Sequence, residues 1–245
     1  MTEIFWINNE NLFFNVLVGL QTVYGQINIV TQVIEELLST EFSSGKWYPQ
    51  NAFLRSGEFA INREGRDQPQ EGMIFQDEHE ETLLSLAHDG SEWLRSQIDA
   101  CKTPSWHAED GLEIHGFLTL PRNGSSAPHP LIVDVHGGPV RAWQDHWADI
   151  EIWAFYVSRG YTVLFPNPRG SAGRGQDFIR GVYGDMGGAD HKDILIGIDQ
   201  LVKSGIVDST RVGVTSRSYG GTMSAWIITQ TDGFVAAVPI AAACD

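Results

Sequence analysis

Cysteine is scarce in this sequence, and so are the features that direct a chain to membranes or nucleic acid. Cys101 and Cys244 are the two cysteines among 245 residues and lie far apart, which excludes a disulfide framework and a CxxC metal site. Lys and Arg number 16 against 31 Asp and Glu, a formal net charge of -15, so we expect no binding to nucleic acid or anionic membranes. No apolar run approaches the length of a membrane span, and no signal-peptide pattern opens the chain. These absences indicate a soluble, cytoplasmic protein.

The rest of the composition is typical of a globular protein, with 42% hydrophobic and 19% charged residues. A chain of this length can bury a large core and can hold one large α/β domain or one and a half smaller ones. Its patterning changes near residue 96. We therefore divide it into a β-rich segment, residues 1–96, and an α/β domain, residues 97–245.

Residues 1–96 are patterned as short strands separated by polar turns. The expected strands are Glu3–Ile7, Asn11–Val18, Gln26–Thr31, Ala52–Ile61 and Met73–Gln76. The run Val33–Leu38 leaves helix and strand open. Short strands at this spacing suit a β-sandwich or propeller blades, and the segment is long enough for one or two blades.

Residues 97–245 alternate strands with helices, which predicts a mostly parallel α/β sheet with flanking helices. The expected strands are Leu112–Leu120, Leu131–Val135, Tyr161–Phe165 and Arg211–Thr215, followed by an apolar run at Val235–Ala243. We expect one helix over Trp143–Arg159, ended by Gly160, and another over Ile194–Val202, ended by Gly205. The run Leu131–Val135 is almost wholly apolar, as in a parallel strand covered on both faces.

The stretch around Ser218 carries the chemistry. A short apolar strand precedes Ser218, a glycine pair follows it, and a helical run begins directly afterwards. A sharp strand-to-helix bend of this kind needs small residues on both sides and exposes the serine hydroxyl at a helix N-terminus. Ser216 occupies the first glycine position of the usual G-x-S-x-G pattern. We interpret Ser218 as a nucleophile.

A second glycine pair follows the first parallel strand, in His136-Gly137-Gly138-Pro139. Glycines there leave backbone N–H groups open to a ligand, so this loop is expected to supply one oxyanion donor, from Gly138 or Gly137. The amide of Tyr219, the residue after the serine, is expected to supply the other. His136 precedes the serine and adjoins the glycine turn, so we interpret it as a histidine that holds the loop.

Two other motifs have less specific explanations. Asp190 and Asp193 stand at the start of an amphipathic run, where carboxylates cap free N–H groups and suit the helix dipole. The glycine-rich run Arg169–Gly175 lacks the G-K-[ST] of a phosphate loop. We therefore expect helix caps at the first site and no nucleotide at the second.

Four motifs in one order resemble the catalytic domain of the prolyl oligopeptidase family of serine peptidases, and above all its acylaminoacyl-peptidase and dipeptidyl-peptidase branches. They are His136–Pro139, Asn167–Gly175, Gly187–Asp190 with Asp193, and Ser218–Gly221. The resemblance covers about Trp106 to Asp245. It implies an α/β-hydrolase fold preceded by part of a β-propeller, Ser218 as nucleophile, and Gly138 and Tyr219 as oxyanion donors. It also implies peptide substrates and no metal or organic cofactor.

The acid–base half of such a site is missing. These hydrolases place an Asp or Glu and then a His after the serine, but only Asp232 and Asp245 follow Ser218, with no histidine. We expect the catalytic Asp and His to lie beyond the end of the chain, which would then be a fragment of a longer peptidase. Two alternatives remain: a carboxylesterase-type hydrolase, and a non-catalytic truncated product.

Overall fold

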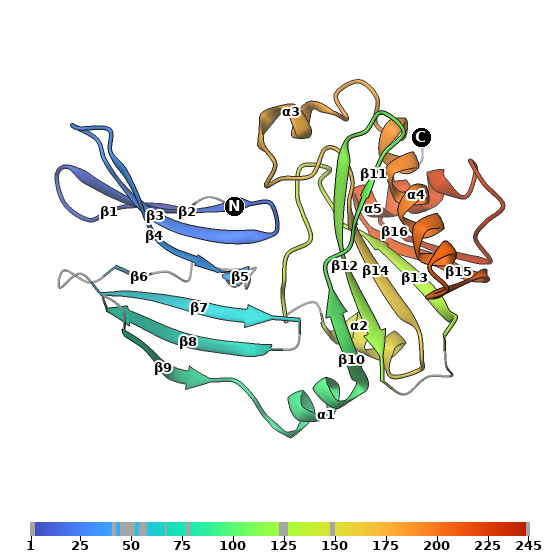
Figure 1. Cartoon of the computed structure of the whole chain (residues 1–245), viewed down its shortest axis with the longest axis horizontal. Helices are drawn as coiled ribbons and strands as arrows, with labels where there is room; N and C mark the ends of the chain where they lie inside the picture. The colour runs from blue at the N-terminus through green and yellow to red at the C-terminus, as the bar shows by residue number, and fades with distance from the viewer. Residues whose placement is uncertain are drawn as a thin grey trace. The chain divides into compact units, whose positions relative to one another are not determined.

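The computed structural model describes residues 3–40, 43–44, 52–53, 58–66, 68–76, 79–122, 127–147 and 150–243. The chain divides into two compact units, which are coloured by residue number in Figure 1. The first unit comprises residues Met1–Glu92 together with Gln144–Ile150, and the second comprises Trp93–Trp143 and Glu151–Asp245. A short segment from the second half of the sequence therefore belongs to the first unit.

The first unit consists of two antiparallel sheets in the residues that the structure describes. One sheet has the order β1 (Glu3–Trp6), β2 (Asn11–Val18), β3 (Gln21–Asn28) and β4 (Ile34–Thr40). The other has the order β5 (Ser43–Ser44), β7 (Phe59–Gly65), β8 (Gln68–Gln76) and β9 (His79–Ser85), with β6 (Ala52–Phe53) paired to β7. Phe13, Tyr24, Ile61, Met73 and Phe75 form the core that the two sheets share.

The strand pairing in this unit tests several of the strands expected from the sequence. The run Val33–Leu38 lies mostly in β4, which pairs with β3 along its length. The expected strand Gln26–Thr31 is wrong in its second half, because β3 ends at Asn28, whose side-chain oxygen accepts the N–H groups of Val30 and Thr31 in a turn. Residues 54–57 of the expected strand 52–61 lie outside the described residues.

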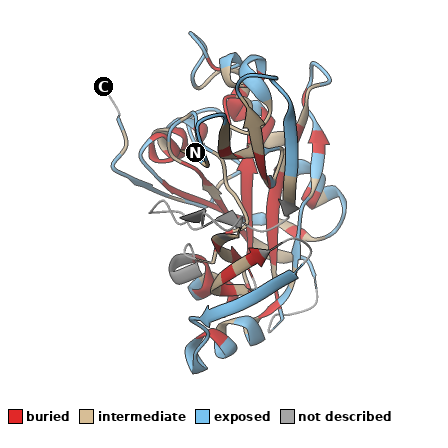
Figure 2. Cartoon of the chain, turned by 90° about the vertical axis from the view of Figure 1, so that its left-hand side faces the viewer, coloured by how far each residue is buried: buried red, intermediate tan, exposed pale blue. Residues whose placement is uncertain are grey.

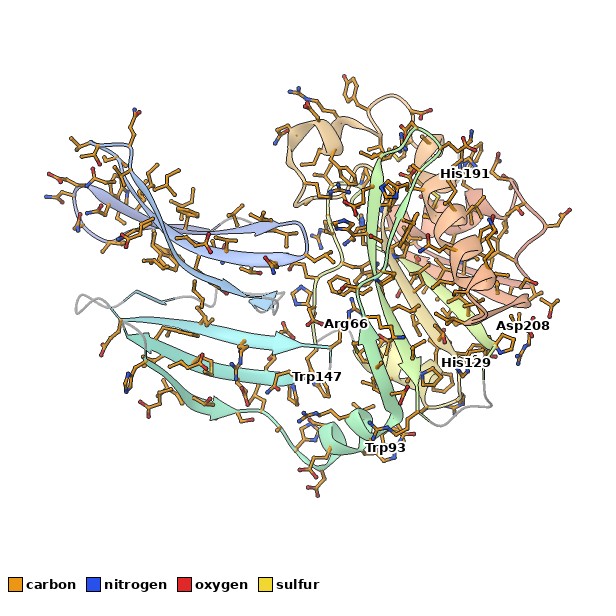
Figure 3. The ribbon with its side chains drawn as sticks, in the orientation of Figure 1. Arg66, Trp93, His129, Trp147, His191 and Asp208 are labelled. Atoms are coloured by element: carbon orange, nitrogen blue, oxygen red, sulfur yellow. The ribbon has the colours of Figure 1, made fainter. Side chains whose placement is uncertain are left out.

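The segment Gln144–Trp147 is bound to β7 and the turn that follows it (Figure 3). The fully buried carboxylate of Glu64 accepts the Trp147 amide at 2.9 Å and faces His146 Nδ1 at 3.1 Å. Arg66, 1% exposed, donates its amide to the Asp145 carboxylate at 2.7 Å and its guanidinium to the Gln144 carbonyl at 3.0 Å.

These hydrogen bonds explain why the expected helix Trp143–Arg159 is wrong in its first half. The apolar periodicity continues through this stretch, but α2 is the shorter helix Ile150–Val157. The Trp143 amide donates to the side chain of Asn167 at 2.7 Å, the Trp143 carbonyl accepts from that side chain at 3.0 Å, and the Trp147 amide donates to Glu64 at 2.9 Å. In a helix that began at Trp143 the Trp147 amide would donate to the Trp143 carbonyl, and here both groups bind other side chains instead.

The second unit contains a seven-stranded sheet in its described residues, with the order β10-β12-β14-β13-β15-β16 and β11 paired to β12. The strands are β10 (Ile98–Lys102), β11 (Ser105–His107), β12 (Glu113–Pro121), β13 (His129–Val135), β14 (Thr162–Asn167), β15 (Val207–Arg217) and β16 (Ala236–Ile240). β13 pairs in parallel with β14 and β15, and β15 with β16, whereas β10, β11 and β12 are antiparallel. The sheet is therefore mixed, and its parallel pairs lie among β13, β14, β15 and β16.

Helices cover both faces of this sheet, and buried residues concentrate in its central strands (Figure 2). The helices in the described residues of the chain are α1 (Asp89–Gln97), which spans the boundary between the two units, α2 (Ile150–Val157), α3 (Gly175–Arg180), α4 (Ala189–Lys203) and α5 (Tyr219–Ile227). The apolar sides of α4 and α5 join one core with the strands, through residues such as Ile194 and Met223. On the opposite face Trp153 of α2 meets the ring of Phe165, so every residue of β14 is buried.

Candidate active site

The bend at Ser218 follows from the course of β15. This strand runs between β13 and β16, and α5 begins one residue after Ser218. Ser218 has φ +63° and ψ −125°, an unusual conformation for a residue other than glycine. Its amide donates to the Ile240 carbonyl at 3.0 Å and its carbonyl accepts the Thr222 amide at 2.9 Å. The Ser218 side chain is exposed, so its hydroxyl lies on the surface at the C-terminal edge of the sheet.

Ser216 occupies the first glycine position of the G-x-S-x-G pattern, and its hydroxyl serves as the hydrogen-bond acceptor of a backbone amide on the neighbouring strand. It is 4% exposed, and its hydroxyl accepts the amide of Val135, the residue opposite it on β13, at 2.6 Å. Gly220 lies against this pair, and a Cβ placed on it would be 2.7 Å from the Cβ of Ser216. The bend therefore tolerates a serine at 216 but no side chain at 220.

The glycine loop reaches Ser218 because β13 and β15 are adjacent parallel strands, whose carboxyl ends meet at one edge. A Cβ placed on Gly137 would lie 3.6 Å from the Cβ of Ser218. Gly138 is exposed and has φ +130°, and a Cβ there would approach the amide nitrogens of Val140 and Arg141 at 2.6 and 2.9 Å. Only glycine can occupy this position without strain. The structure thus brings Gly137, Gly138, Ser218 and Tyr219 together.

His136 holds the glycine loop, as the sequence predicts. It is 4% exposed, with Nδ1 2.8 Å from the Gly137 carbonyl and Nε2 2.8 Å from the Ser171 hydroxyl. A carbonyl oxygen only accepts, so Nδ1 carries the proton. The Gly137 carbonyl and the Gly138 N–H belong to one peptide plane and point in opposite directions. By binding the carbonyl, His136 therefore sets the direction of the Gly138 N–H.

We expect acid to destabilise the fold through His136. Burial lowers the pKa of His136 from 6.5 to about 4, so the unfolded chain takes up a proton before the folded one does. The stabilisation is complete above about pH 6.5 and is lost as the pH falls toward 4, by about 3 kcal/mol in all. Denaturant unfolding at pH 7 and pH 4.5 should show a smaller acid loss in His136→Gln than in the wild type. The matched control is His107→Gln at an exposed site, and an acid loss equal in all three proteins would contradict the assignment.

Asp190 and Asp193 were expected as helix caps, and this expectation is wrong for Asp193. The N-cap of α4 is Gly188, which has no side chain, and the amides of Ala189 and His191 in the first turn are accepted by Asp185 at 3.0 Å and by Asp190 at 2.9 Å. Asp193 is fully buried and binds Arg169 instead, accepting Nε at 2.8 Å, Nη2 at 2.9 Å and the backbone amide at 3.0 Å. Asp190 accepts the amides of Gly187 and His191. Its shortest hydrogen bond, from the Tyr219 hydroxyl at 2.6 Å, could not be expected from the sequence.

Asn167 opens one of the four motifs, but sequence reasoning assigned it no role. Its side chain accepts the Trp143 amide at 2.7 Å and donates to the Trp143 carbonyl at 3.0 Å, which fixes the chain that leaves the glycine loop. Its place at the end of a buried strand was the available signal. Within the described residues no group of three or more metal-ligating side chains gathers, and no helix is both long and apolar enough to cross a membrane.

No histidine in the described residues forms a hydrogen bond with Ser218. Both nitrogens of His136 are engaged elsewhere, and Nδ1 of His191 lies 2.9 Å from the Gly187 carbonyl. Asp232 is exposed, and Asp245, like Cys244, lies outside the described residues. Among the described residues, the site therefore presents a serine and backbone amides with no histidine hydrogen-bonded to the serine.

Comparison with known proteins identifies the family of this domain. Residues 148–245 match the model of the prolyl oligopeptidase family, Peptidase_S9. These residues belong to the prolyl oligopeptidase family. An uncharacterized peptidase, YuxL, of Bacillus subtilis is 36% identical over 176 residues, covering 70% of this chain and 26% of the relative. Acylamino-acid-releasing enzyme 1 of Oryza sativa is 37% identical over 113 residues, covering 46% of this chain and 14% of the relative.

Solved structures of the family extend the likeness to the fold. An acylaminoacyl peptidase in complex with Z-Gly-Gly-Phe-chloromethyl ketone superposes with a TM-score of 0.76 at 25% identity, over 95% of this chain and 36% of that protein. The second unit thus has the α/β-hydrolase fold, and the first unit is built from antiparallel strands. The chain spans about a quarter or less of the curated relatives that it matches here.

Proposed function

We propose that this chain carries the nucleophile and oxyanion half of a serine peptidase active site. Ser218 attacks the scissile carbonyl, and the amides of Gly138 and Tyr219 stabilise the oxyanion that forms. The observation that supports this most directly is the exposed Ser218 at φ +63°, beside a glycine loop whose second member requires positive φ. The Tyr219 amide lies in the first turn of α5, where helix N–H groups have no partner four residues earlier.

The base and the carboxylate that orients it are assigned to residues outside these 245. No histidine follows Ser218, and His136 is tied to the glycine loop with a pKa of about 4. Without a base the oxyanion hole and substrate binding still accelerate the reaction, but far less than a complete triad. We therefore expect little or no peptide hydrolysis by this chain alone.

The substrate class follows from the family members. One relative is named an acylamino-acid-releasing enzyme, and one neighbour holds a peptidyl chloromethyl ketone. We assign oligopeptides, or peptides with acylated or dipeptidyl N-termini, as substrates, and the cytoplasm as the location. The antiparallel sheets of residues 1–96 are of the kind that build propeller blades, and we place them in a partial β-propeller before the hydrolase domain, residues 97–245.

Labelling with a fluorophosphonate probe tests the nucleophile. We expect slow labelling of the folded chain that Ser218→Ala abolishes and Ser204→Ala, at an exposed serine in the same unit, leaves unchanged. No labelling of a folded chain would contradict the nucleophile and favour a non-catalytic role. Peptide hydrolysis that is rapid and is lost in Ser218→Ala would instead show that the base lies within this chain.

A further inference from the structure

The side chain of Tyr219, the residue after the bend at Ser218, is hydrogen-bonded to the buried carboxylate of Asp190. The proposed mechanism gives this carboxylate no role. The Tyr219 ring is 6% exposed, and the Tyr219 hydroxyl donates to Oδ2 of Asp190 at 2.6 Å. Burial, followed by the charge of Asp190, raises the pKa of Tyr219, so the hydroxyl stays protonated and keeps donating. Because the backbone amide of Tyr219 is the proposed oxyanion donor, an anchor on its side chain bears on the reaction.

Asp190 is itself firmly held. It has no exposed surface, Oδ1 accepts the His191 amide at 2.9 Å, and Oδ2 also accepts the Gly187 amide at 3.1 Å. The Gly187 carbonyl in turn accepts Nδ1–H of His191 at 2.9 Å and Nε1–H of Trp226 at 2.5 Å. Since Trp226 belongs to the last turn of α5, this network binds both ends of that helix to the start of α4.

The Tyr219 ring also lies beside His136, the residue that holds the glycine loop. Its centroid lies 6.4 Å from that of His136, with 34° between the ring planes. His136 sets the Gly137–Gly138 peptide, and Asp190 holds the ring that packs beside His136. One buried carboxylate therefore supports the residues behind both amides.

We propose that Asp190 is a positioning residue for the reaction of Ser218: through the Tyr219 hydroxyl it holds the first turn of α5 so that the Tyr219 amide faces the developing oxyanion. This inference rests on the proposed function. It gives a catalytic consequence to a hydrogen bond between residues 29 positions apart, which would otherwise be a plain packing contact.

Two variants disturb this network with little change of shape: the first removes the hydrogen bond, and the second leaves a single accepting oxygen for three donors. Tyr219→Phe deletes only the hydroxyl, and Asp190→Asn replaces one accepting oxygen by an NH₂ group that cannot accept. The matched controls are Tyr183→Phe, at a tyrosine that is 91% exposed, and Asp232→Asn, at an exposed aspartate. All four proteins are compared with the wild-type chain.

Hydrogen exchange gives a readout that needs no catalysis. The Thr222 amide donates to the Ser218 carbonyl and reports the first turn of α5. We expect its exchange to accelerate about tenfold or more in both variants and to stay unchanged in both controls. Unchanged exchange in Tyr219→Phe and Asp190→Asn would overturn the proposal whether or not the chain is active.

The link to the oxyanion is tested with a p-nitrophenyl ester and its thionoester, counting only the rate that Ser218→Ala removes. Sulfur accepts hydrogen bonds poorly, so the ratio of ester rate to thionoester rate measures the oxyanion donors. We expect Tyr219→Phe to lower this ratio about tenfold, a part of the loss seen when one donor is removed outright. A merely structural loss would lower both rates equally and keep the ratio, which would overturn the proposal. A wild-type rate equal to that of Ser218→Ala would count against the proposed function, and hydrogen exchange would still decide the role of Asp190.

Discussion

Replacing Gly220 with alanine is expected to lower the free energy of unfolding by about 2–4 kcal/mol, although alanine is the better helix former. Gly220 is the second residue of α5, and helix propensity alone favours alanine over glycine by about 1 kcal/mol. The added methyl group would, however, overlap the carbonyl oxygen of Val135 and lie 2.7 Å from the Cβ of Ser216. Neither atom belongs to a flexible side chain, so α5 would have to move away from β13. Packing therefore outweighs propensity.

Denaturant unfolding of Gly220→Ala and Gly233→Ala checks this expectation. A Cβ on Gly233 would meet only the Thr231 hydroxyl at 3.4 Å, so this control should stay within about 0.5 kcal/mol of the wild type. Fluorophosphonate labelling should be lost in Gly220→Ala together with the geometry of the bend. If the two variants unfolded at the same denaturant concentration, the claim that Gly220 packs tightly against β13 would be wrong.

Removing the carboxylate of Asp193 is expected to cost about 3–5 kcal/mol, because it leaves a partly buried cation without its main partner. The Arg169 side chain is 12% exposed and that of Asp193 is 1% exposed. The guanidinium of Arg169 stays protonated in any variant, because arginine is not deprotonated in proteins, and the hydrogen bonds it donates to Asp193, and then to Asp110, raise its pKa further. Without Asp193, the guanidinium and the Arg169 amide would lose three hydrogen bonds.

Asp110 provides the matched control for this ion pair. It binds the other side of the same guanidinium at 2.9 and 3.1 Å, but its side chain is 55% exposed. Water can replace it, so Asp110→Ala should destabilise several-fold less than Asp193→Ala in denaturant unfolding. The double variant Arg169→Met, Asp193→Leu should recover most of the loss, since an apolar pair needs no charged partner. Equal losses in Asp110→Ala and Asp193→Ala would contradict this account.

Strand and helix positions in the second unit were largely predictable because buried parallel strands have recognisable apolar runs. Leu131–Val135 lies in β13 and Tyr161–Phe165 largely in β14, both within a core that covers the sheet. The helix at Trp143–Arg159 was predicted too long. Its periodicity is real, but Glu64 binds the Trp147 amide from 83 residues away, and no local pattern encodes such a contact.

In the candidate site, too, the features set by local sequence were predictable and the long-range contacts were not. Ser218 and the glycines at 137 and 138 were recognisable because a bend with positive φ, or a backbone open to a ligand, admits few residue types. Asp190 and Asp193 have the spacing of helix caps; Asp190 does accept the first-turn amide of His191, but Asp193 does not cap the helix. Their partners, Tyr219 and Arg169, are 29 and 24 residues away.

The sequence by itself determined the strand–bend–helix unit around Ser218 and the glycine loop after β13, because both depend on local steric limits that particular residues satisfy. Only the tertiary structure decided what holds these parts in place: His136 on the Gly137 carbonyl, Asp190 on the Tyr219 hydroxyl and Asp193 on Arg169. A buried polar group must find a partner wherever the fold brings one within about 3 Å, and that partner is chosen by packing rather than by position along the chain.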